Sequence, residues 1–146
     1  MTIAHDRFDD VQASFGRCLR KKGFITRFYE ILMDSHPDIH PMFQRTDFGQ
    51  QRKALRRGIS IAISFAAGSK SAQISMDNMA NIHSVDGRAP VEPFYYQYWL
   101  DSLISTLAET DPRFSPSLES RWRAAMQITI DYFSQAFKAE PQRKLA

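Results

Sequence analysis

The hydrophobic residues of this chain recur at intervals of three and four along most of its length, which is the period of an amphipathic α-helix. Valine is scarce and no segment alternates strictly between apolar and polar residues, so the sequence does not predict a sheet. The expected fold class is therefore all-α. Apolar stripes, glycines and prolines divide the chain into predicted helices over residues 6–22, 24–35, 37–42, 50–67, 72–83, 91–109 and 116–138.

Two of these helices carry features that bear on packing. Gly58 lies inside the helix over residues 50–67, where glycine is unfavourable, so it is expected to permit the close approach of another helix. The helix over residues 91–109 is marked at its start by Pro90 and Pro93 and is rich in aromatic residues. Its inward stripe is expected to consist of Val91, Tyr95, Trp99, Leu103 and Leu107.

Composition narrows the class of protein. The 146 residues, 43% of them hydrophobic, suit a single domain with a real core, frayed at residues 1–5 and 139–146. Cys18 is the only cysteine, so no intramolecular disulfide can form. The longest uncharged apolar-rich run, residues 58–68, is too short to span a membrane, and the polar N-terminus differs from a signal peptide. We therefore expect a cytoplasmic protein with no membrane partner.

The net charge of +3 comes with short basic clusters, such as the one at residues 52–57. Each cluster suits a solvated helix face or a tail. No helix-turn-helix, zinc-finger or aromatic RNA-binding motif accompanies them, so no nucleic-acid partner is expected.

The segment with the strongest candidate ligand is residues 76–88, MDNMANIHSVDGR, which contains His83. Three apolar residues at helical spacing precede His83 on one stripe, which directs the imidazole towards the interior. Asp86 and Gly87 end the helix just past it. A buried imidazole needs a hydrogen-bond partner. Taken alone, the segment favours a core histidine bonded to a backbone carbonyl, and the alternative is a metal ligand.

Residues elsewhere in the chain favour the ligand. They form an ordered set of motifs: Phe28-Tyr29, His36-Pro37, Pro41-Met42-Phe43, the segment from Gln51 to Leu55, and His83. Each motif is weak alone, but in this order the set resembles the globin family, in particular single-domain bacterial haemoglobins and the globin domain of flavohaemoglobins. The resemblance covers residues 8–138. It implies a globin fold of about seven helices packed around a haem pocket, with haem b as the cofactor.

The resemblance implies that His83 is the axial ligand of the haem iron. Its Nε2 would bind the metal, while Nδ1–H would donate to a nearby carbonyl that holds the ring in place. Met79, one turn earlier, and the turn after His83 are the two candidate sources of that carbonyl.

The rest of the implied pocket is mostly apolar. Phe43 would pack on the porphyrin, and its alternative is plain core. Arg88 or the Arg56-Arg57 pair would meet the haem propionates, with solvent-facing charge as the alternative. The remaining pocket residues, for which core packing without haem contact is the alternative, are Leu55, Ile59, Ile82, Val91, Tyr95, Trp99 and Met126.

The resemblance implies that Tyr29 and Gln51 lie on the distal side of the haem, opposite His83, where they contact the bound gas. Dioxygen on ferrous haem is polarised towards superoxide, so neutral donors such as a phenol and a carboxamide stabilise it without offering a ready proton. The alternative for Tyr29 is a hydroxyl at the surface, and the alternative for Gln51 is an exposed helix residue. Gln50 is adjacent and could be the donor instead, but only Gln51 lies one turn before Leu55 on the same face.

Two function classes follow. The first is NO dioxygenation, in which dioxygen and NO yield nitrate and an external reductase restores the iron. The chain has no Gly-rich nucleotide fingerprint, and its last helix lacks the glutamate that flavohaemoglobins place beside the proximal histidine, although Tyr95 or Tyr96 can supply their tyrosine. The second class is a gas-sensing or oxygen storage and delivery globin that binds dioxygen, NO or CO and acts through a partner or a homodimer. A haem-free interaction module is the remaining alternative.

Overall fold

The computed structural model describes residues 6–143, with side chains up to residue 137. This part of the chain is helical throughout its regular structure and contains no strand, so the all-α prediction is confirmed. Its helices are α1 (Asp9–Leu19), α2 (Phe24–Asp34), α3 (Ile39–Met42), α4 (Phe48–Ala66), α5 (Ser71–Ile82), the 3-10 helix η1 (Pro93–Tyr95), α6 (Tyr96–Thr110) and α7 (Pro116–Arg143). Helix α7 continues past Lys138, where the sequence predicted its end. Residues 1–5 and 144–146, two stretches of predicted fraying, lie outside the described residues.

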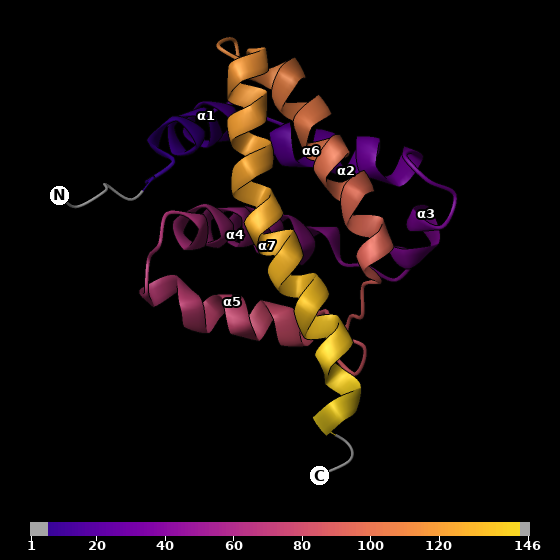
Figure 1. Cartoon of the computed structure of the whole chain (residues 1–146). Helices are drawn as coiled ribbons and strands as arrows, with labels where there is room; N and C mark the ends of the chain where they lie inside the picture. Colours follow the sequence, from indigo (N-terminus) through magenta and orange to yellow (C-terminus); the bar gives the residue numbers. More distant parts are fainter. Residues whose placement is uncertain (1–5, 144–146) are drawn as a thin grey trace, which may run out of the picture.

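The helices pack in crossed layers. Helices α4 and α5 run side by side in opposite directions, α7 crosses both of them, and α2 packs against α6 (Figure 1). A Cβ at Gly58 would lie 3.7 Å from Sδ of Met79, so the predicted close approach of another helix at Gly58 is confirmed. Because α4 and α5 are antiparallel, the first turn of α4 and the last turn of α5 lie at the same end of the pair.

Helix α1 begins later than predicted because of Phe8. This residue has φ 51°, a left-handed conformation that cannot continue a helix, and its N–H donates to the Asp6 carboxylate at 2.9 Å. The Phe8 ring is buried, and the guanidinium of Arg121 lies 4.6 Å from its centre. Burial of the ring and this cation–π contact offset the strain at the start of α1.

Side-chain hydrogen bonds also move the starts of α3 and α4. The N–H of Asp38 donates to Nδ1 of His36 at 3.0 Å, and α3 begins only after this turn. Asp47 caps α4 by accepting from the N–H of Gln50, so α4 begins two residues before the predicted position 50. The sequence analysis did not identify this cap.

The inward stripe of α6 differs from the prediction over its first half. Because η1 turns with three residues per turn, α6 enters with a different phase from a continuous α-helix. Tyr96 and Leu100 are buried, whereas Tyr95 and Trp99 are only half-buried. The prediction for Leu103 and Leu107 is correct, since both are fully buried.

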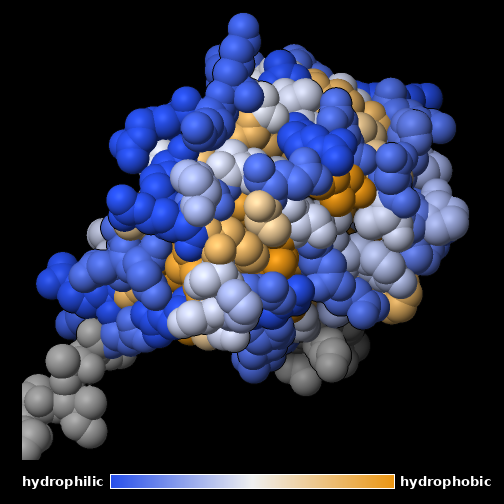
Figure 2. All heavy atoms as spheres, turned by 90° about the horizontal axis from the view of Figure 1, so that it is seen from above, coloured by the Kyte–Doolittle hydropathy of each residue, from blue (hydrophilic) through white to orange (hydrophobic). Residues whose placement is uncertain are grey.

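Hydrophilic side chains cover most of the face seen from above, with smaller apolar patches between them (Figure 2). Among the described residues, no helix combines the length and the apolar character that crossing a bilayer requires. The single-domain interpretation stays a prediction.

A buried carboxylate joins α1 to the turn between α6 and α7. Asp111 accepts from the Ser14 hydroxyl at 2.7 Å and from Nε of Arg17 at 2.8 Å, and Ser14 in turn accepts from Nε1 of Trp122 at 3.0 Å. The Arg17 guanidinium holds the pKa of Asp111 well below its ordinary value, at about 2, against the opposing effect of burial. Since breaking a buried pair leaves an uncompensated charge, this network stabilises the packing of α1 on α7.

We predict that Asp111→Asn makes stability less sensitive to acid. A carboxylate whose folded pKa is depressed stabilises the fold above its unfolded pKa, and the stabilisation is lost as the pH falls from about 5 to about 2. The free energy of unfolding of the unmodified protein should therefore fall by about 2 kcal/mol more than that of the variant over this interval. Urea titrations at several pH values measure the difference, and parallel curves would contradict it.

Candidate functional site

The imidazole of His83 is held at the end of α5. Its Nδ1 lies 3.0 Å from the carbonyl oxygen of Ala89. A carbonyl can only accept, so this bond requires a proton on Nδ1, and in the neutral imidazole the free lone pair is then on Nε2. The carbonyl of Met79 accepts from the backbone N–H of His83 instead. Of the two predicted sources of the carbonyl, the turn after His83 is therefore the correct one.

The loop that carries Ala89 folds tightly over the end of α5. The N–H of Ala89 donates to the Ile82 carbonyl at 3.0 Å, and the N–H of Val91 donates to the His83 carbonyl at 3.1 Å. A Cβ at Gly87 would lie 2.2 Å from the carbonyl oxygens of Asn81 and Ile82. The loop can make this approach only because residue 87 has no side chain.

Aromatic side chains flank His83 on the side of α7. The Phe133 ring centre lies 5.7 Å from that of His83, and the Tyr96 ring lies 6.0 Å from Phe133. The Tyr96 hydroxyl is buried without a hydrogen-bond partner among the described residues, and burial raises its pKa. Of the two tyrosines left open by the sequence, Tyr96 is the one buried near His83.

Tyr29 and Gln51 meet where α2 crosses the start of α4. Nε2 of Gln51 donates to the Tyr29 hydroxyl at 3.0 Å, and that hydroxyl donates in turn to the backbone carbonyl of Gln51 at 3.4 Å. Gln50 is exposed and its side chain takes no part in this contact. Burial raises the pKa of Tyr29 to about 12, while the bond from Gln51 lowers it in part, so the phenol is neutral in the physiological range.

Two phenylalanines surround the Tyr29 ring. The centres of Phe43 and Phe48 lie 5.7 Å and 5.5 Å from it, and the two rings stack on each other at 5.9 Å. Phe48 was not identified from the sequence. It precedes Gln51 by one helical turn, so a helix start placed at the Asp47 cap reveals it on the same face.

One solved structure places this arrangement among known proteins. The chain matches a protein of Pseudomonas aeruginosa PAO1 with a TM-score of 0.84 and 29% sequence identity, over 90% of this chain and 98% of that one. The crystal structure of that protein is described as structurally highly homologous to a human haemoglobin. The chain has the globin fold. The resemblance drawn from the sequence motifs is thereby confirmed.

Sequence comparison alone does not reach this result. No protein-family model matches this chain, and a search of curated proteins found no significant match. The ordered motifs and the structural likeness carry the identification.

The predicted pocket residues of the globin fall into two groups. Ile59 and Met126 are fully buried in the core. The half-buried residues that pack beside the core, with part of their apolar surface uncovered, are Phe43, Leu55, Val91, Tyr95 and Trp99. Ile82 is also half-buried.

Three predicted contacts need correction or qualification. The Tyr95 hydroxyl donates to Asp38 at 2.9 Å, so its polar end is engaged in another cluster. The Arg56-Arg57 pair lines a hollow between α1 and α4 rather than the end of α4 that carries Gln51. Arg88 is exposed in the loop after His83, where its predicted role stays open.

These residues fit a haem on three counts. The neutral tautomer of His83 has its free lone pair on Nε2, and Tyr29 and Gln51 present neutral polar groups. Helices α4 and α5 bring Gln51 and His83 to the same end of the helix pair (Figure 1). A flat macrocycle beside them would cover the half-buried apolar side chains. His83 is the side chain that would hold the iron, and Phe43 and Leu55 are among those that would hold the ring.

We predict that Gly87→Ala displaces the Ala89 carbonyl from His83. The added Cβ collides with backbone oxygens, so the loop must move, at about 1 to 3 kcal/mol in stability. Nitrogen-edited NMR of the His83 side chain measures the change as faster exchange of the Nδ1 proton with solvent. Gly16→Ala is the matched control, because a Cβ there meets nothing within 4 Å. Identical His83 signals in both variants would contradict the prediction.

Proposed function

We propose that this globin binds haem b through Nε2 of His83 and reversibly binds dioxygen, NO or CO beside Tyr29 and Gln51. The observation that carries the proposal is the hydrogen bond from His83 Nδ1 to the Ala89 carbonyl, which selects the tautomer whose neutral imidazole has its free lone pair on Nε2. The likeness to a protein described as homologous to haemoglobin supports it.

When bound, haem supplies a ferrous iron that accepts a diatomic gas. His83 donates its Nε2 lone pair, and the Ala89 carbonyl fixes the direction of that lone pair. A neutral carbonyl strengthens the donor less than a carboxylate would. The imidazole is therefore a moderate donor, which suits reversible binding.

The distal pair supplies hydrogen bonds without a proton source. Gln51 donates to the oxygen of Tyr29, and the Tyr29 hydroxyl donates to the backbone carbonyl of Gln51 over a long 3.4 Å contact. A polar ligand beside the pair would compete with this weakly held carbonyl for the phenolic proton. The high pKa of Tyr29 keeps this proton on the phenol. Polarised dioxygen is stabilised by such a donor and is not readily protonated.

The chemistry proposed for this site is NO dioxygenation. In net terms, NO, dioxygen and one electron yield nitrate, and an external reductase supplies the electron. Tyr29 and Gln51 favour this reaction because they stabilise the polarised dioxygen that reacts with NO. We also propose that the protein is cytoplasmic, so that the reductase would reach the site there.

A second candidate, storage or sensing without turnover, is favoured by one observation. The group packed against His83 from α7 is the Phe133 ring rather than a carboxylate. The proximal side of this globin thus lacks, among its described contacts, the electron push that a negative neighbour would supply. A sensing globin of this kind would report the bound gas to a partner protein or across a homodimer.

We predict that His83→Ala loses haem or retains it weakly, because no other imidazole lies at this position. The ratio of Soret to protein absorbance after reconstitution and gel filtration measures retention. His40→Ala is the matched control, since His40 is exposed on α3. Stoichiometric haem with an unchanged spectrum in His83→Ala would overturn the proximal assignment, and a wild-type protein that takes up no haem would favour the interaction module.

We predict that Tyr29→Phe and Gln51→Leu each speed dioxygen release by about five- to tenfold, since one net hydrogen bond is worth about 1 to 1.4 kcal/mol. Stopped-flow displacement by CO measures the rate. Gln50→Leu should leave the release rate unchanged.

Mixing the oxygenated proteins with NO and a reductase separates the dioxygenase from the storage or sensing globin. Multiple-turnover nitrate formation identifies a dioxygenase, and a single turnover leaves storage or sensing. Equal release rates in all variants would remove Tyr29 and Gln51 from the distal role.

A further inference from the structure

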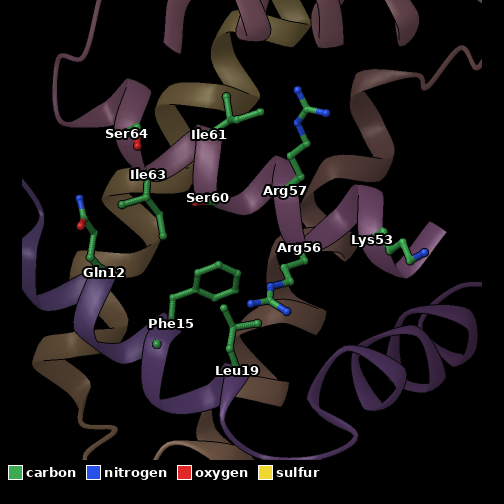
Figure 3. A pocket seen from close by; sticks show the side chains of 11 residues that line it. Gln12, Phe15, Leu19, Lys53, Arg56, Arg57, Ser60, Ile61, Ile63 and Ser64 are labelled. Carbon is green, nitrogen blue, oxygen red and sulfur yellow. The ribbon is translucent and has the colours of Figure 1, made fainter. Parts of the chain in front are cut away.

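A groove lies between α1 and α4, away from the proposed haem site. Its volume is about 500 Å³, within the range of small-molecule sites. Figure 3 shows the groove with the two helices on either side. The lining residues are Gln12, Phe15, Gly16 and Leu19 from α1, and Lys53, Arg56, Arg57, Ser60, Ile61, Ile63 and Ser64 from α4.

The floor of this α1–α4 groove is apolar. The Phe15 ring and the Ile63 side chain point towards each other, with Leu19 beside them (Figure 3). The space above Gly16 is open, because a Cβ built there meets no atom within 4 Å. Space of this kind between two helices is normally filled by side chains. The missing side chain at Gly16 leaves room for a slender apolar chain.

The rim of the groove is cationic. Lys53, Arg56 and Arg57 line it, no acidic residue does, and none of the three forms an ion pair within residues 6–137. By contrast, Arg17 and Arg121 each bind a carboxylate of this chain. Figure 3 shows the Arg56 guanidinium directed towards α1, above Leu19.

The groove and the distal pair use opposite faces of α4. Residues 53, 56, 57, 60 and 64 share one helical face, whereas Gln51 and Leu55 lie on the other. A ligand in the groove therefore does not compete with haem for the same space.

We propose that the α1–α4 groove binds the anion of a fatty acid. Arg56 takes the carboxylate through charge-assisted hydrogen bonds, with Lys53 and Arg57 adding favourable charge. The alkyl chain lies over Gly16 against the half-buried side chain of Leu19, where it displaces water from apolar surface above the buried Phe15 and Ile63. This site is independent of the proposed haem function.

The test is NMR titration of the nitrogen-labelled full chain with laurate below its micelle concentration. Saturable shifts should be confined to the groove residues and be the same with and without haem. Arg56→Gln should weaken binding ten- to a hundredfold, because a charge-assisted bond is lost. The matched control is Arg52→Gln, an exposed residue on α4 that does not line the groove. Dodecyltrimethylammonium, with the same chain and the opposite charge, should not bind.

A second pair of variants tests the floor. Gly16→Leu fills the groove and should abolish laurate binding, while Gly16→Ala should keep it; circular dichroism checks that both fold. The proposal is overturned if Arg56→Gln or Gly16→Leu binds laurate as the unmodified chain does. Shifts at His83 and Tyr29 that vanish on haem loading would place laurate in the haem site, and binding only to anionic phosphatidylglycerol vesicles would indicate a membrane surface. Either outcome also overturns the proposal.

Discussion

The hydrogen bond between His83 and the Ala89 carbonyl constrains everything that follows it in the chain. To deliver that carbonyl, the loop must turn back over α5, which requires glycine at position 87 and engages the carbonyls of Ile82 and His83. The chain then leaves through η1, whose tighter turn sets the phase of α6. The burial of Tyr96 rather than Tyr95 follows from this path, so the loop determines both the orientation of the imidazole and what lies behind it.

On the other side of the site, the arrangement depends on electroneutral groups. Tyr29 lies among the rings of Phe28, Phe43 and Phe48, and such surroundings disfavour any charged form. The carboxamide of Gln51 satisfies the phenolic oxygen without introducing charge. A partly buried polar pair of this kind keeps its geometry because separating the two side chains breaks their hydrogen bond and raises the free energy.

Sequence patterns predicted the helices more completely than the contacts within the site. Helix identity and the close approach at Gly58 followed from periodicity and local rules, which also gave the turn after His83 as one of two sources of its carbonyl partner. The start of α4 was misplaced because the Asp47 cap was overlooked, and that error hid Phe48. The choice between Tyr95 and Tyr96, and the contact of Phe133 with His83, depend on the phase of η1 and on packing between distant segments, which local spacing does not encode.

The raised pKa of Tyr29 has a consequence for how such a site would respond to its surroundings. Neither Tyr29 nor Gln51 changes its charge in the physiological range. The distal hydrogen bonds are thus decoupled from proton uptake, and gas affinity governed by them would not shift when the cell acidifies. Oxygen carriers that unload in acidic tissue rely on groups that titrate near neutrality. A protein built around this pair would instead report gas concentration alone.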